Sequence, residues 1–125
     1  MSKEQTKNIL LEKADKLAFQ VYQVSKKFPK SELFGLTSQV QRSALSIPLN
    51  IIEGFARQRP KEYVRFLEVS YASLKETKYL LYFAHREKYI TKIDYEKIIQ
   101  LAEEIGKIIW SKINKLKQGI ADSSN

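Results

Sequence analysis

The chain has 125 residues and a mass of 14.6 kDa, enough for one domain and too little for a second core. It contains no cysteine, which excludes disulfide frameworks and thiolate metal sites, and its 4 glycines and 3 prolines are too few for the many turns of a sandwich or barrel. A net charge of +8, from 22 basic and 14 acidic residues, favours a polyanionic partner: nucleic acid, an acidic membrane surface or an acidic protein. No signal peptide or membrane-spanning apolar run is recognisable, so we expect a cytoplasmic protein.

The first half of the chain carries the pattern of two helices, in which apolar residues recur every three or four positions. The first helix runs from about Leu10 to Phe28, and Pro29 ends it. The second begins near Thr37, its expected N-cap, and continues to about Arg57.

The second half predicts two further helices. The third opens at Pro60, a residue suited to the first helical turn, and continues to about Lys88. Thr91 and Asp94 have the spacing of a capping box, so the fourth helix begins there and is expected to end before Gly119.

The connections between these helices are short, so consecutive helices should lie antiparallel. The predicted fold class is therefore all-α, an up-down-up-down antiparallel four-helix bundle. Residues 1–118 form its single domain, and residues 119–125 are expected to be a flexible C-terminal tail.

The predicted second helix is apolar over most of its circumference. At about 100° per residue, one apolar line holds Val40, Ala44, Ile47, Ile51 and Phe55, and a second holds Leu45, Leu49 and Ile52. A helix of a monomeric bundle needs one apolar stripe, so the second line indicates contact with another subunit. The alternative is a helix buried deeply within a monomer. Pro48 lies in the middle of the helix and is expected to kink it.

The remaining arc of this helix is polar and predicts a hydrogen-bonded network. Glu53 and Glu76 of the third helix could form an acid pair, but a buried or interfacial network that includes arginine is the stronger interpretation. The residues assigned to this network or interface are Gln39, Arg42, Ser46, Asn50, Glu53 and Glu76.

One part of the pattern resembles a known family. The resemblance is carried by Leu36-Thr37, Gln39, Arg42, Ser46-Ile47-Pro48, Asn50-Ile51 and Glu53-Gly54, then by Phe28-Pro29, Glu32, Phe66-Leu67, Ser73-Leu74 and Glu76. These residues are similar to the signature of the four-helix-bundle proteins encoded in intervening sequences of 23S ribosomal RNA genes, over roughly residues 15 to 115. Gln41, Ser43 and Ile52 depart from that signature, which usually has arginine, alanine and alanine there.

The resemblance implies a bundle that assembles into a ring, with a pentamer favoured. It also relates the chain to the accessory proteins of diversity-generating retroelements, which are basic bundles that associate with nucleic acid.

Basic residues concentrate where the predicted topology brings the start of helix one, the turn between helices two and three and the end of helix four together. Lys3 and Lys7 belong to this pole. The residues assigned to nucleic-acid binding are Arg57, Arg59, Lys61, Arg65, Lys112, Lys115 and Lys117. Such a cluster attracts a phosphate backbone, although it can also be an ordinary solvated face.

Enzyme signatures are weak. His85 is the only histidine and no Glu-x-x-His pair exists, which excludes the di-iron arrangement of some bundles, and the isolated glycines form no nucleotide-binding motif. No catalytic residue, metal or cofactor is expected, His85 is expected to be solvated, and the tyrosines are expected in the core or at interfaces.

The leading hypothesis is a non-enzymatic homo-oligomer that binds nucleic acid, with RNA favoured by the resemblance. The expected partners are the protein itself and nucleic acid, with no membrane. The alternative is a structural interaction module that recruits a protein partner and has no nucleic-acid role.

Overall fold

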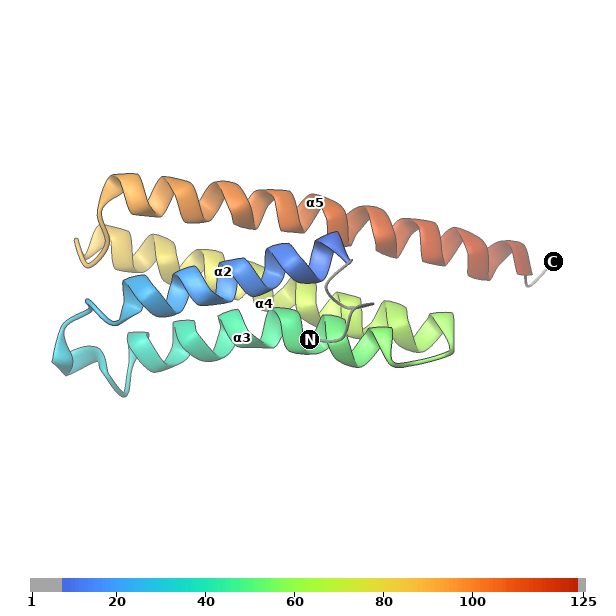
Figure 1. Ribbon diagram of the computed structural model, residues 1–125, viewed down its shortest axis with the longest axis horizontal. Coiled ribbons are helices and arrows are strands. Elements are labelled where there is room, and N and C mark those ends of the chain that lie inside the picture. The colour runs from blue at the N-terminus through green and yellow to red at the C-terminus, as the bar shows by residue number, and fades with distance from the viewer. Residues whose placement is uncertain (1–7, 124–125) are drawn as a thin grey trace.

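The computed structural model describes residues 8–123. Helices α2 (Ile9–Ser25), α3 (Leu36–Phe55), α4 (Pro60–Arg86) and α5 (Lys92–Ser123) run in alternating directions, and a short 3-10 helix, η1 (Lys30–Glu32), lies between α2 and α3 (Figure 1). α2 packs on α3, α3 on α4, α4 on α5, and α5 on α2. The predicted antiparallel four-helix bundle is confirmed, and the described part of the chain contains no strand.

The core lies along the bundle axis and is almost entirely aliphatic. Each helix contributes side chains with no exposed surface, among them Leu17 of α2, Ile47 of α3, Leu67 and Leu81 of α4, and Ile105 of α5. Burying one such side chain contributes roughly 1.5–3 kcal/mol, so the apolar periodicity is sufficient to bring the four helices together.

Two helix ends in the first half differ from the expected ones. α2 ends at Ser25, where a turn begins in which the Phe28 N–H donates to the Ser25 carbonyl at 3.1 Å. The N-cap of α3 is Gly35, whereas Thr37 is buried within the first turn. The expected side-chain cap is instead supplied by Glu32, whose carboxylate accepts from the Leu36 N–H at 3.4 Å.

The expected helix starts in the second half are confirmed. Pro60 is the first residue of α4, and the Thr91 hydroxyl accepts from the Asp94 N–H at 3.2 Å just before α5. α3 also continues through Pro48 as one helix.

The expected end of the last helix before Gly119 is wrong, because α5 continues through Gly119 to Ser123. Leu116 and Ile120 are partly buried against the core on either side of Gly119. This packing offsets the cost of about 1 kcal/mol of a glycine within a helix. Residues 124 and 125 of the expected tail lie outside the described residues.

Candidate nucleic-acid interface

The turn between α3 and α4 and the C-terminal part of α5 lie at the same end of the bundle (Figure 1). We call this end the basic pole and define it by Arg57, Arg59, Lys61, Arg65, Lys112, Lys115 and Lys117. The topology therefore brings the segments that carry these residues to one end, and their assignment to nucleic-acid binding stays a prediction. Lys3 and Lys7, which were also assigned to this pole, lie outside the described residues.

Three of the cations surround one hollow. Arg59, Lys61 and Lys115 line a space of about 580 Å³ together with the apolar Leu116 and Ile120. At this pole α2 begins short of the α3–α4 turn, whereas α5 extends past that turn (Figure 1). Among residues 8–123, none of the three cations takes part in an ion pair, so their charge is not neutralised locally.

The other four predicted cations do not line this hollow. Arg57 donates to Glu53 at 2.7 Å and lies over the Phe66 ring at 5.0 Å, and Lys117 lies 3.6 Å from Glu68. These pairs are exposed, and such pairs are typically worth about 0–1 kcal/mol. The remaining two are Arg65, which is exposed, and Lys112, which is half-buried.

The predicted polar network is only partly assembled within one chain. The Asn50 amide donates to the Ser46 hydroxyl at 2.9 Å and to the Ser46 carbonyl at 2.8 Å. Glu53 pairs with Arg57 instead of Arg42. Within residues 8–123, Gln39, Arg42 and Glu76 are exposed and make no side-chain hydrogen bond or ion pair, so their assignment to this network is not supported inside the chain.

The polar contacts between α3 and α4 instead use small hydroxyl side chains. The hydroxyls of Ser43 and Thr77 lie 2.8 Å apart, as do those of Ser46 and Ser73, and the Ser70 hydroxyl donates to the Ile47 carbonyl at 3.0 Å. In the sequence, hydroxyl residues recur at helical spacing at Ser70, Ser73 and Thr77. That repeat could have predicted these polar contacts between α3 and α4. We call these contacts the hydroxyl ladder.

Two positions that depart from the family signature have partners within the chain. Ser43 belongs to the hydroxyl ladder, and the Gln41 amide donates to the Ser25 hydroxyl at 2.8 Å. The substitutions are therefore accommodated by hydrogen bonds between neighbouring helices.

Two of the three residues of the second apolar line of α3 lie on the surface of the chain, whereas Ile52 is partly buried against the core. Leu45 is 39% exposed and Leu49 is 59% exposed, while Val40, Ala44, Ile47 and Ile51 on the other line are fully buried. The interpretation of α3 as a helix buried on all sides within a monomer is therefore wrong. Leu45 and Pro48 also line a shallow hollow with Phe19 of α2, which is 65% exposed.

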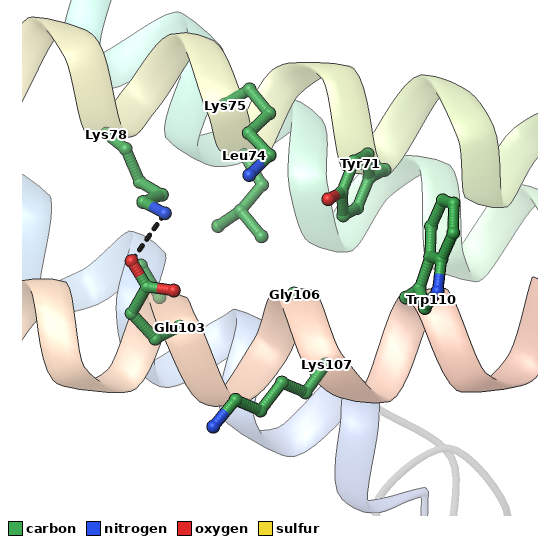
Figure 2. Close-up of a pocket in the computed structure, with 9 residues that line it drawn as sticks. Tyr71, Leu74, Lys75, Lys78, Glu103, Gly106, Lys107 and Trp110 are labelled. Atoms are coloured by element: carbon green, nitrogen blue, oxygen red, sulfur yellow. Dashed lines mark ion pairs between the residues drawn. The ribbon is translucent and has the colours of Figure 1, made fainter.

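A groove between α4 and α5 was not expected from the sequence. Tyr71, Lys75, Lys107 and Trp110 line it, and Lys78 forms an ion pair of 2.6 Å with Glu103 at one end (Figure 2). This pair, together with the charges of Lys75 and Lys107, holds the pKa of Glu103 below its ordinary value. Trp110 is 56% exposed, and the missed sequence signal was its position outside the apolar line of Ile105, Ile109 and Ile113.

His85 is half-buried and stacks on Tyr95 with ring centroids 4.5 Å apart, so the expectation of a solvated histidine is wrong. Burial raises the pKa of Tyr63 and Tyr95.

The described residues contain no group of three or more potential metal ligands, and no helix within them is long and apolar enough to span a membrane.

Comparison with solved structures identifies a similar bundle. It is the crystal structure, at 1.70 Å, of a protein with unknown function from the S23 ribosomal protein family from Bacteroides thetaiotaomicron VPI-5482. The two chains are 28% identical, with a TM-score of 0.79, and the match covers 84% of this chain and 98% of that one. No curated protein matches the sequence.

Comparison with protein families gives a match that spans most of the molecule. Residues 6–111 match the family described as 23S rRNA-intervening sequence protein. The chain therefore belongs to the 23S rRNA-intervening sequence protein family.

Proposed function

We propose that this protein is a non-enzymatic, homo-oligomeric four-helix bundle that binds nucleic acid, with RNA as the preferred form. The observation that carries the proposal is the arrangement of Arg59, Lys61 and Lys115 around one hollow of the basic pole, with no ion pair to them among residues 8–123. No catalytic residue, metal or cofactor forms part of the proposal.

Phosphate contacts explain how such a pole binds nucleic acid. Each lysine or arginine that neutralises a phosphate releases a condensed counterion, so affinity falls steeply as salt rises. These contacts carry little sequence information, so binding is tight at low salt and weakly selective. The family description concerns 23S rRNA intervening sequences, which makes structured RNA the first nucleic acid to test.

Electrophoretic retardation at several salt concentrations tests this function, with structured RNA, duplex DNA and single strands as probes. Changing Arg59, Lys61 and Lys115 together to glutamine should weaken binding to every probe. It should also reduce the slope of log affinity against log salt by about 2 to 3, because three phosphate contacts are lost.

The matched control changes three exposed lysines at the opposite pole, Lys26, Lys27 and Lys30, to glutamine. This variant has the same net charge as the first but should retain most of the binding. Equal losses from both variants would mean diffuse charge instead of a binding surface. No binding by the wild-type protein at low salt would overturn the proposed function and favour the structural interaction module.

The assembly part of the proposal rests on the exposed Leu45 and Leu49 of α3 and on the exposed Phe19 of α2, which lines one hollow with Leu45. Contact with a second copy would remove this apolar surface from water, which stabilises an assembly by roughly 25 cal/mol for each Å² buried. Family resemblance favours a pentamer.

Light scattering on a sizing column tests the assembly. The wild-type protein should elute as an oligomer, and Leu45→Arg with Leu49→Arg should release the monomer of 14.6 kDa without lowering its helix content. A wild-type monomer at micromolar concentration would contradict the assembly.

A further inference from the structure

The groove between α4 and α5 combines an exposed tryptophan, which lies beside a half-buried tyrosine, with lysines that are in no ion pair within residues 8–123. The rings of Tyr71 and Trp110 lie 5.9 Å apart between centroids, at an interplanar angle of 40°. The Lys75 ammonium lies 5.2 Å from the Tyr71 ring centroid, and Lys107 lines the same groove. Figure 2 shows the two aromatic side chains next to each other at one end of the groove, with Lys75 reaching toward it from α4 and Lys107 extending from α5.

The groove is hollow because of a small residue on α5. A side chain at Gly106 would begin 3.3 Å from Leu74 Cδ2 and 4.0 Å from Tyr71 Cε2, so glycine leaves the space of about 260 Å³ open. More than half of the Trp110 side chain remains exposed, at 56%, although its ring already contacts Tyr71.

The charge of the groove selects an anion. Its lining contains three lysines and one carboxylate, Glu103, which is already paired with Lys78. Within the described residues, Lys75 and Lys107 are in no ion pair. An aromatic surface next to free ammonium groups fits a ligand that has a flat apolar ring system and a phosphate, the two parts of a nucleotide.

We propose that this groove binds an unpaired nucleotide of the bound nucleic acid, with its base stacked on Trp110 and its phosphate next to Lys75 and Lys107. This inference rests on the proposed function and specifies it, because a base inside a duplex has no free face for stacking. The protein should therefore prefer single-stranded or looped segments over continuous duplex.

The position of the groove fits a strand that also reaches the basic pole. α5 carries Trp110 and, seven residues further along, Lys117 of the basic pole; at about 100° and 1.5 Å per residue, Lys117 lies on nearly the same face of the helix and about 10 Å along its axis from Trp110. A strand of a few nucleotides can span that distance, so the same molecule can contact both places.

Trp110 is the only tryptophan in the chain, so its fluorescence reports directly on the groove. Titration of the full protein with a 12-nucleotide single-stranded RNA of uridines should quench this fluorescence until saturation. The matched RNA duplex, which has the same phosphate backbone, should bind through the pole with little quenching. Single-stranded DNA of the same length tests whether the ribose contributes.

Two sets of variants distinguish the contribution of base stacking on Trp110 from that of the lysine charges. Trp110→Ala should weaken single-strand binding by about tenfold and leave duplex binding unchanged, while Trp110→Phe should retain most of the single-strand affinity. The matched control is Phe34→Ala, which removes an aromatic ring that is 95% exposed outside the groove and should change neither. Lys75→Gln with Lys107→Gln should lower the salt slope for single strands by about 1.4.

The outcomes distinguish this inference from the proposed function. Equal affinity for single strand and duplex, with no quenching and no effect of Trp110→Ala, would overturn the stacking site and leave the charge-based function in place. No binding to any probe at low salt would overturn both. A loss of duplex binding in Trp110→Ala equal to the loss of single-strand binding would also contradict stacking.

Discussion

The two interfaces that α4 forms with its neighbours, one with α3 and one with α5, are built in different ways. We call these helix–helix interfaces the α3–α4 seam and the α4–α5 seam. Towards α3, the seam uses small side chains: the hydroxyl ladder and Gly54, which lies directly against Phe66 and Tyr63. Towards α5, larger side chains leave a surface groove, with Tyr71, Trp110 and the Lys78–Glu103 ion pair along it. A seam of small residues brings two backbones close together, so a larger side chain cannot be accommodated there. The α4–α5 groove accepts a larger side chain and has space for a ligand.

The largest effect is expected at Gly54. A Cβ there would lie 2.9 Å from Phe66 Cβ and 2.9 Å from Tyr63 Cδ1. Since Phe66 Cβ is attached directly to the α4 backbone, the two helices must move apart. Gly54→Ala should therefore lower the free energy of unfolding by about 2 kcal/mol, although alanine is the better helix former. Urea denaturation measures the change, and an unchanged midpoint would mean that the α3–α4 seam is loosely packed.

The next effect concerns the hydroxyl ladder. Thr77→Val keeps the shape of the side chain but removes the hydroxyl that lies 2.8 Å from Ser43 Oγ and 2.8 Å from the Ser73 carbonyl. Because Thr77 is fully buried, we expect a loss of about 1–2 kcal/mol in the free energy of unfolding. Thermal denaturation followed by circular dichroism provides the measurement. An equal or higher melting temperature would show that the ladder is no stronger than apolar packing.

Gly106 in the α4–α5 seam is the matched comparison for Gly54. A Cβ at Gly106 would lie 3.3 Å from the far end of Leu74, a flexible side chain that can shift, and at an ordinary contact distance of 4.0 Å from Tyr71 Cε2. Gly106→Ala should therefore leave the free energy of unfolding unchanged or raise it by up to about 1 kcal/mol, through the better helix propensity of alanine. If both alanine variants lost the same stability in urea, the proposed difference between the two seams would be wrong.

The smallest effect is expected at the Lys78–Glu103 ion pair, in which the Glu103 side chain is 54% exposed. Lys78→Gln should cost about 0–1 kcal/mol at neutral pH. Because Lys78 lowers the pKa of Glu103 below its ordinary value, this contribution is present above the unfolded-state pKa and disappears as the pH falls through the lowered folded-state value. Melting temperatures of the two proteins should therefore converge in strong acid. A difference that grew on acidification would contradict the pairing.

Local sequence determined the helices and most of their ends. Pro60 and Thr91 start helices where they stand because their effects act within one turn of the chain. The concentration of cations at one pole also follows from the sequence, because short connections force alternating helix directions. Gly119 wrongly predicted the end of the last helix. The unfavourable helix propensity of one glycine is small compared with the packing of Leu116 and Ile120 on the core.

Only the tertiary structure decided which side chains meet. The polar arc of α3 predicted from the sequence is real, but the rotation and register of α3 against α4 pair its serines with Ser73 and Thr77 and leave Arg42 and Glu76 at the surface. In the same way, the groove next to Trp110 exists because Gly106 of α5 faces Leu74 and Tyr71 of α4. Periodicity places a residue on a face of its own helix, and the packing of neighbouring helices determines what that face contacts.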